Sequence, residues 1–170
     1  MLDQYNYDGG SLKLDFVVSP EETQQYEMFG TRASELEIDP VLYNSHTWGI
    51  NPDKFKTDAG LSAMFKLTAT HTMPDPDNRV FTASMESDKY PFIGTQFHPE
   101  KPAHLFYEGK GINHSWESIK LNQVFADTFI AMTRLNENYF GDFAEVQAEI
   151  IDNYDIIVTS SYYGKVYVFK

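Results

Sequence analysis

Short runs of alternating apolar and polar residues, rich in β-branched and aromatic side chains, recur along the chain and predict strands. The predicted strands and extended segments lie at residues 12–18, 41–50, 66–71, 80–85, 90–97, 154–160 and 165–169. Tyr163-Gly164 separates the last two, which predicts a β-hairpin at an edge of the sheet. Residues 1–11 are polar and end in Gly9-Gly10, so a flexible entry or a turn is expected there.

One long helix is predicted in the second half of the chain. Apolar side chains recur there at spacings of three and four residues: Leu121, Val124, Phe125, Thr128, Phe129, Met132 and Leu135. This spacing predicts an amphipathic helix from Trp116 to about Asn136, capped by Ser115 and packed on the sheet. Shorter helices are expected at residues 19–29, 33–38, 57–65 and 143–150.

The composition narrows the class of protein. A chain of 170 residues with 42% hydrophobic residues can bury the core of one globular domain. Its formal net charge of −12 would be repelled by nucleic acid and by an anionic membrane surface, so neither is expected as a partner. No stretch reaches the roughly 18 apolar residues of a membrane span. The first ten residues lack the basic and apolar regions of a secretory signal.

The sequence contains no cysteine. Disulfides, thiolate metal sites and thiol nucleophiles are therefore all excluded within this chain.

The richest candidate chemistry follows the predicted strand at residues 90–97. Gly94 would let another backbone approach this strand closely. Pro99 cannot extend a strand ladder, so the strand is expected to stop at His98 and to present it at a sheet edge or tip. Glu100 lies two residues further on, which suits a general base and the carboxylate that orients it. A His-x-Glu pair alone also fits a surface histidine or a satisfied structural pair.

The chain resembles the γ-glutamyl hydrolases in the string MESDKYPFIGTQFHPEK, residues 85–101. These enzymes are cysteine hydrolases built on the class I glutamine amidotransferase fold. The whole superfamily shares the His-Pro-Glu element, whereas the longer string is more particular to the γ-glutamyl hydrolases. The similarity runs from about Gly9 to the C-terminus and covers only the C-terminal part of the family's domain. It implies an α/β fold with an incomplete, flavodoxin-like sheet and flanking helices, as one partial domain over residues 1–170.

A second informative stretch, VLYNSHTWGI at residues 41–50, places Asn44, His46 and Trp48 on one face of an extended segment. The spacing alone favours packing plus a surface histidine. The family carries an Asn-x-His-x-Trp element at this place, and its histidine lines the active-site cleft. The resemblance therefore implies substrate binding by His46 and Trp48.

The resemblance also implies a mechanism. In the family a cysteine attacks the γ-glutamyl amide, a histidine moves the proton and a glutamate orients the histidine. His98 matches the histidine and Glu100 the glutamate. The cysteine would lie before Gly9 and must come from a missing N-terminal part or a partner chain. The chain alone is expected to be inactive, with apolar surface exposed on one edge and face of its sheet.

Through the family, the expected substrate is a folate poly-γ-glutamate, hydrolysed without metal or cofactor. The expected location is the lysosome, the vacuole or the outside of the cell. Two alternatives stay open: another class I glutamine amidotransferase fragment, or a catalytically dead binding module. The Lys-Tyr-Pro and Asn-x-His-x-Trp elements disfavour the first.

Two other histidines, His71 and His104, are weaker candidates for a functional role. His71 lies in a threonine-rich strand and is expected on a solvated face. His98, Glu100 and His104 have metal-ligand side chains, but a proline separates the first two and disfavours a metal site.

Overall fold

The computed structural model of the chain describes residues 2–159 and 165–169. By its internal contacts the chain divides into two compact units, Met1–Arg134 and Leu135–Lys170, which are described separately below. The expectation of a single partial domain remains a prediction.

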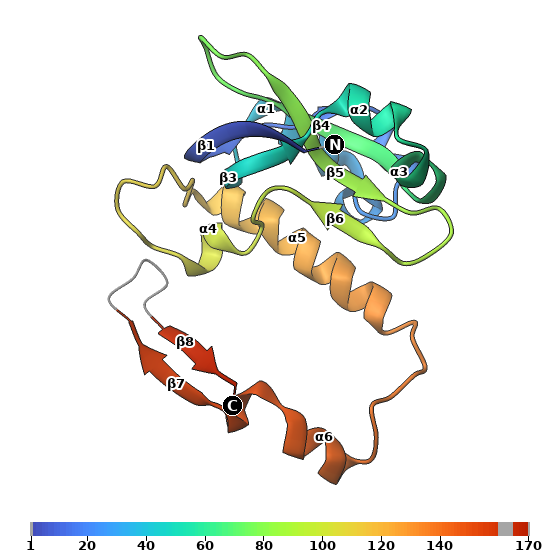
Figure 1. Cartoon of the computed structure of the whole chain (residues 1–170), viewed down its shortest axis with the longest axis vertical. Coiled ribbons are helices and arrows are strands. Elements are labelled where there is room, and N and C mark those ends of the chain that lie inside the picture. Colours follow the sequence, from blue (N-terminus) through green and yellow to red (C-terminus); the bar gives the residue numbers. More distant parts are fainter. Residues whose placement is uncertain (1, 160–164, 170) are drawn as a thin grey trace. The chain divides into compact units, whose positions relative to one another are not determined.

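The first unit contains two antiparallel sheets (Figure 1). One pairs β1 (Leu2–Leu12) with β3 (Leu42–Ile50). The other has the order β2-β4-β5-β6, with β2 at Asp15–Phe16, β4 at Lys66–Thr72, β5 at Val80–Glu86 and β6 at Ile93–Thr95. This mixed α/β architecture confirms the predicted fold class and is consistent with part of a glutamine amidotransferase-like fold.

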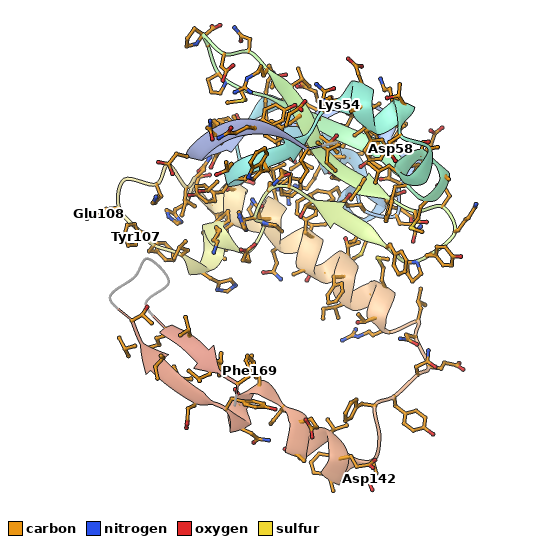
Figure 2. The ribbon with its side chains drawn as sticks, viewed as in Figure 1. Lys54, Asp58, Tyr107, Glu108, Asp142 and Phe169 are labelled. Carbon is orange, nitrogen blue, oxygen red and sulfur yellow. The ribbon has the colours of Figure 1, made fainter. Side chains whose placement is uncertain are left out.

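The helices of the first unit are short, except for the last. They are η1 (Pro20–Glu22), η2 (Glu27–Ser34), α1 (Glu35–Ile38), α2 (Pro52–Thr57), α3 (Ala59–Met64), α4 (Lys101–His104) and α5 (Trp116–Thr133). Asp58, labelled in Figure 2, caps α3 by accepting hydrogen bonds from the backbone of Gly60 and Leu61. Ser115 caps α5 as predicted, because its Oγ accepts a bond from the Ser118 N–H at 3.2 Å.

Aromatic side chains hold α5 against the sheet. Phe125 packs against Tyr26, Phe29 and Phe97, with ring centroids 5.9, 4.9 and 5.2 Å away. Leu121 is buried in the same cluster. Through Phe97, the loop after β6 therefore packs against the buried face of α5.

Two residues of the apolar stripe predicted for the long helix are exposed rather than buried. Phe129 and Leu135 were expected to point inward, yet they are 56% and 84% exposed. Phe129 is uncovered although it follows the periodicity of Leu121 and Phe125. Leu135 lies beyond the helix, which ends at Thr133. Periodicity identifies a stripe on the helix, but the stripe extends further than the surface that covers it.

The second unit consists of α6 (Phe143–Glu149), η3 (Ile151–Asn153), β7 (Asp155–Val158) and β8 (Lys165–Val168). Asp142 caps α6 in a capping box with Glu145 (Figure 2). β7 and β8 pair antiparallel, which confirms the predicted hairpin strands. Tyr163-Gly164 lies outside the described residues. The hairpin's place at the edge of the sheet remains a prediction.

Two local predictions were wrong, and one short helix was missed. Residues 2–12 form a strand rather than a flexible entry, because they pair with β3 and bury Tyr5 and Leu12. The segment after Ser19 forms two 3₁₀ helices with Gly30 at positive φ between helical turns, instead of one helix to Phe29. α2, with Asn51 as its N-cap, was not among the predicted helices.

Candidate functional site

His98 lies in the loop between β6 and α4. β6 ends at Thr95, three residues earlier than predicted, because the chain then leaves β5 to approach β3. The Gln96 N–H still donates to the Ala83 carbonyl at 2.8 Å, and the His98 N–H donates to the Tyr43 carbonyl at 2.8 Å. Backbone bonds to two different sheets therefore fix the position of His98.

The side chains of His98 and Glu100 form a pair. His98 Nδ1 lies 3.1 Å from Glu100 Oε1, and the two side chains are 40% and 53% exposed. Partial burial raises the pKa of Glu100, but the hydrogen bonds from His98 and from the backbone, with the charge of Lys101, lower it to about 2. Glu100 is thus a carboxylate at neutral pH, and it accepts the hydrogen bond from His98. His98 Nδ1 therefore carries the proton, and its Nε2 has a free lone pair.

His46 lies on β3, beside the loop that carries His98. Its ring packs edge-on against Phe81 at a centroid distance of 4.7 Å and faces Tyr7 of β1 at 6.4 Å. By distance and angle, neither ring nitrogen makes a hydrogen bond to the described residues, although the Trp48 backbone lies close enough to raise the pKa of the ring. Desolvation lowers the pKa of His46 and the charge of His98 adds to this effect, while the backbone of Trp48 opposes it. His46 is therefore a neutral imidazole near pH 7.

A polar cavity of about 270 Å³ opens beside His46. Tyr7, Asp8 and Ser45 line it together with His46, where the pairing of β1 with β3 shifts register around Tyr7. His46 lines this cavity, while its two ring nitrogens are themselves buried.

The other two residues of the Asn-x-His-x-Trp element have different environments. Asn44 is fully buried and its Nδ2 donates to the Leu42 carbonyl at 3.0 Å. Trp48 is 53% exposed. Of the three residues, the structure therefore buries Asn44, places His46 at the cavity and leaves Trp48 at the surface.

His71 contradicts its sequence-based interpretation. Its side chain is fully buried, not solvated, and its ring lies between Phe81 and Phe97 at centroid distances of 5.4 and 5.7 Å. Its Nδ1 lies 2.8 Å from the Lys13 carbonyl, and desolvation lowers its pKa to about 4. Leu67, Ala69 and Met73 are buried at the alternate positions around it. That alternation was the signal in the sequence for an inward-facing histidine.

Neither a metal-binding cluster nor a membrane-spanning helix is found in the described part of the chain. Within residues 2–159 and 165–169, no group of three or more His, Cys, Asp or Glu side chains could hold a metal ion. In the same residues, no helix has the length and apolar character that crossing a membrane requires.

The chain is similar to several curated proteins, although no protein-family model matches it. It is 27% identical over 173 residues to γ-glutamyl hydrolase B of Dictyostelium discoideum. The aligned region covers all of this chain and 49% of the relative. The γ-glutamyl hydrolase of Homo sapiens is 26% identical over 94% of this chain and 50% of its own length. γ-Glutamyl hydrolase 2 of Arabidopsis thaliana is 32% identical over 71% of this chain and 33% of its own length. The chain spans about half the length of the first two relatives.

Proposed function

Because the chain is a homologue of the γ-glutamyl hydrolases, we propose that it supplies the histidine and glutamate of a cysteine-type hydrolase that cleaves γ-glutamyl bonds. The observation that carries the proposal is the pair of His98 and Glu100, 3.1 Å apart. Its position after β6 is fixed by backbone bonds, as a proton-transfer group requires.

In the proposed mechanism Glu100 holds His98 in one tautomer. Nδ1 donates to the carboxylate, so Nε2 takes the proton from a thiol and later returns it to the leaving amine. The ionised Glu100 stabilises the imidazolium that forms in between. The thiol must come from outside this sequence, which has no cysteine.

His46 is proposed to contact the substrate. It is neutral near pH 7, and its unpartnered nitrogens can donate one hydrogen bond and accept another. A neutral imidazole beside the polar cavity suits the carboxylate and amide groups of a glutamate chain. Trp48, half-exposed on the same strand, offers an apolar surface at the edge of this region.

The remaining proposals rest on the resemblance to the γ-glutamyl hydrolase family. The substrate is a folate poly-γ-glutamate, and the reaction is hydrolysis without metal or cofactor. The nucleophile comes from an N-terminal part or a partner chain. The protein acts in the lysosome or vacuole or is secreted.

A fusion protein tests the proposed function. The N-terminal half of γ-glutamyl hydrolase B of Dictyostelium discoideum, the part outside the matched region, is joined to Met1 of this chain. The fusion is expected to release glutamate from pteroyl-poly-γ-glutamate, while the chain alone releases none. His98→Asn should lower the rate at least about 10³-fold, and Glu100→Gln on the order of 10²- to 10⁴-fold.

The matched control is His114→Asn, at a histidine whose Nδ1 lies 2.8 Å from the Pro102 carbonyl, in the loop that precedes α5. It should leave the rate within about twofold. Glutamate release by the fusion that survives His98→Asn would contradict the proposal, as would release by the chain alone.

A further inference from the structure

Tyr43 lies on β3, directly before the Asn-x-His-x-Trp element, and only 1% of its surface is exposed. It pairs with Ser11 of β1 in the register of the two-stranded sheet. Asn44 and His46 belong to the element that follows, but Tyr43 itself does not. A buried tyrosine on a strand is most often a core residue, yet the surroundings of Tyr43 give it a second role.

Tyr43 contacts His98 in two ways. Its carbonyl oxygen accepts a hydrogen bond from the His98 N–H at 2.8 Å, which fixes the backbone of the loop after β6. Its ring lies beside the imidazole, with the two ring centroids 6.2 Å apart and the ring planes tilted by 40°. Tilted or offset aromatic rings attract each other over such distances. One buried residue therefore restrains both the main chain and the side chain of His98.

Glu100 alone is a weak restraint on the imidazole. Its Oε1 lies 3.1 Å from His98 Nδ1, but its side chain is 53% exposed. Water competes for an exposed pair of this kind, and both side chains lose conformational freedom when it forms. Tyr43 is buried and has no such freedom. The orientation of His98 therefore depends on Tyr43 as well as on Glu100.

The far end of the Tyr43 ring lies against Gly9 of β1. A Cβ atom at Gly9 would lie 3.0 Å from the Tyr43 hydroxyl oxygen and 3.2 Å from the Lys110 carbonyl oxygen. Gly9 also has a φ of 99°, which residues with a side chain rarely adopt. Glycine thus lets β1 approach both Tyr43 and the loop after α4. The ring is held between β1 and His98.

The hydroxyl group of Tyr43 is not what holds His98. It is buried, and it has no hydrogen-bond partner among residues 2–159 and 165–169. A buried hydroxyl without a partner costs free energy instead of stabilising the fold. The aromatic ring is therefore the part of Tyr43 that matters, and phenylalanine should replace it without loss.

We propose that Tyr43 is a positioning residue, which holds the His98 imidazole where Nδ1 donates to Glu100 and Nε2 keeps its lone pair for a thiol. Tyr43 acts through His98 and is assigned no contact with substrate. The effect on catalysis rests on the proposed function. The orientation of the imidazole does not, because it is a property of the chain by itself.

Nuclear magnetic resonance of the full chain tests this orientation without any catalysis. Nuclear Overhauser contacts between the ring protons of Tyr43 and His98 are expected in the wild-type chain. Nitrogen-15 spectra at pH 8.5 should show His98 as the Nδ1–H tautomer, with its signals identified by their loss in His98→Asn. Tyr43→Leu and Tyr43→Met should lower the ratio of the Nδ1–H to the Nε2–H form at least about fivefold. Tyr43→Phe should leave it within about twofold.

The matched control is Tyr5→Leu. Tyr5 is 3% exposed on β1, the partner strand of β3, and it packs on Phe81 at a centroid distance of 5.3 Å. The substitution removes a buried tyrosine from the same sheet. It should leave the tautomer ratio of His98 within about twofold of the wild-type value.

The fusion with the N-terminal half of the Dictyostelium discoideum relative tests the effect on catalysis. Tyr43→Leu should lower kcat at least about tenfold and leave KM within about twofold, because a misplaced base slows proton transfer without weakening binding. Tyr43→Phe should keep kcat within about twofold, and Tyr5→Leu within about threefold.

The positioning role is overturned if the wild-type chain shows no contact between the two rings. It is also overturned if Tyr43→Leu and Tyr43→Met keep the wild-type tautomer ratio, or if Tyr5→Leu changes that ratio equally. The ring contact needs no substitution, so it decides even where a variant fails to fold. An inactive wild-type fusion would refute the hydrolase alone. An active fusion whose kcat is unchanged by Tyr43→Leu would refute the positioning role alone.

Discussion

Two histidines of the first unit belong to the same sheet region, His71 on β4 and His98 in the loop after β6, and lie in opposite environments. His71 lies in the middle of β4, fully buried between two phenylalanine rings, and burial lowers its pKa to about 4. His98 follows the short strand β6, and its side chain is 40% exposed beside Glu100. Both have one ring nitrogen in a hydrogen bond. The partner differs: a neutral carbonyl for His71 and an ionised carboxylate for His98.

This difference separates a structural histidine from a candidate catalytic one. Burial disfavours the charged form of His71 more than the Lys13 carbonyl and the charge of Asp15 favour it, so its imidazole is neutral in the folded state near pH 7. His98 instead has an accessible imidazole bonded to a carboxylate, which is the arrangement of a proton-transfer group. Phe97 connects the two regions, because it packs on His71 at 5.7 Å and immediately precedes His98.

The largest expected effect on stability comes from truncating Phe97, which connects the two regions. Phe97 is 2% exposed and packs on both His71 and Phe125, so Phe97→Ala should lower the free energy of unfolding by about 3–5 kcal/mol. Phe92→Ala is the control, since Phe92 is 49% exposed and should cost less than about 1 kcal/mol. Urea denaturation at pH 7.5 measures both. Equal losses in the two variants would rule out the packing role of Phe97.

Acid is expected to destabilise the fold by protonating His71. The unfolded chain binds a proton at His71 below about pH 6.5, whereas the folded chain does so only near pH 4. The stability contribution is therefore complete above pH 6.5 and lost as pH falls toward 4, by about 3 kcal/mol. His71→Asn should reduce the loss of stability between pH 7.5 and pH 4.5 by about 2 kcal/mol. An unchanged pH profile in urea denaturation would show that His71 is not the buried group responsible.

Glu100 should affect the fold far less. It is 53% exposed at the side chain, so Glu100→Gln is expected to change the free energy of unfolding by under about 1 kcal/mol at pH 7. The carboxylate itself should titrate near pH 2 in carbon-13 NMR of the folded protein, because His98 and Lys101 stabilise its charge. A midpoint at the ordinary glutamate value would mean that the pair is not formed in solution.

Trp48 should contribute least to stability. It is 53% exposed on β3, so Trp48→Ala is expected to cost about 0.5 kcal/mol or less in urea denaturation at pH 7.5. If Trp48 binds substrate, the same substitution in the active fusion should raise KM more than it lowers kcat. A large loss of stability would instead assign the side chain to packing.

The sequence predicted the elements whose residues interact locally. The cap at Ser115, the spacing of Leu121 and Phe125 and the β-branched run of β4 depend on near neighbours along the chain. The His98–Glu100 pair also follows from a two-residue spacing beside a proline, although the roles of both residues remain a proposal.

Only the tertiary structure decided which faces are buried. β1 was expected to be flexible because its residues are polar, and the strand was missed because its partner, β3, begins 30 residues further along the chain. β6 ends early because His98 is bonded to Tyr43, a contact between residues 55 positions apart. His71 was expected to be exposed and is buried, whereas Phe129 was expected to be buried and is exposed. Periodicity predicts only the side of an element on which a residue lies, because burial depends on which distant part of the chain covers that side.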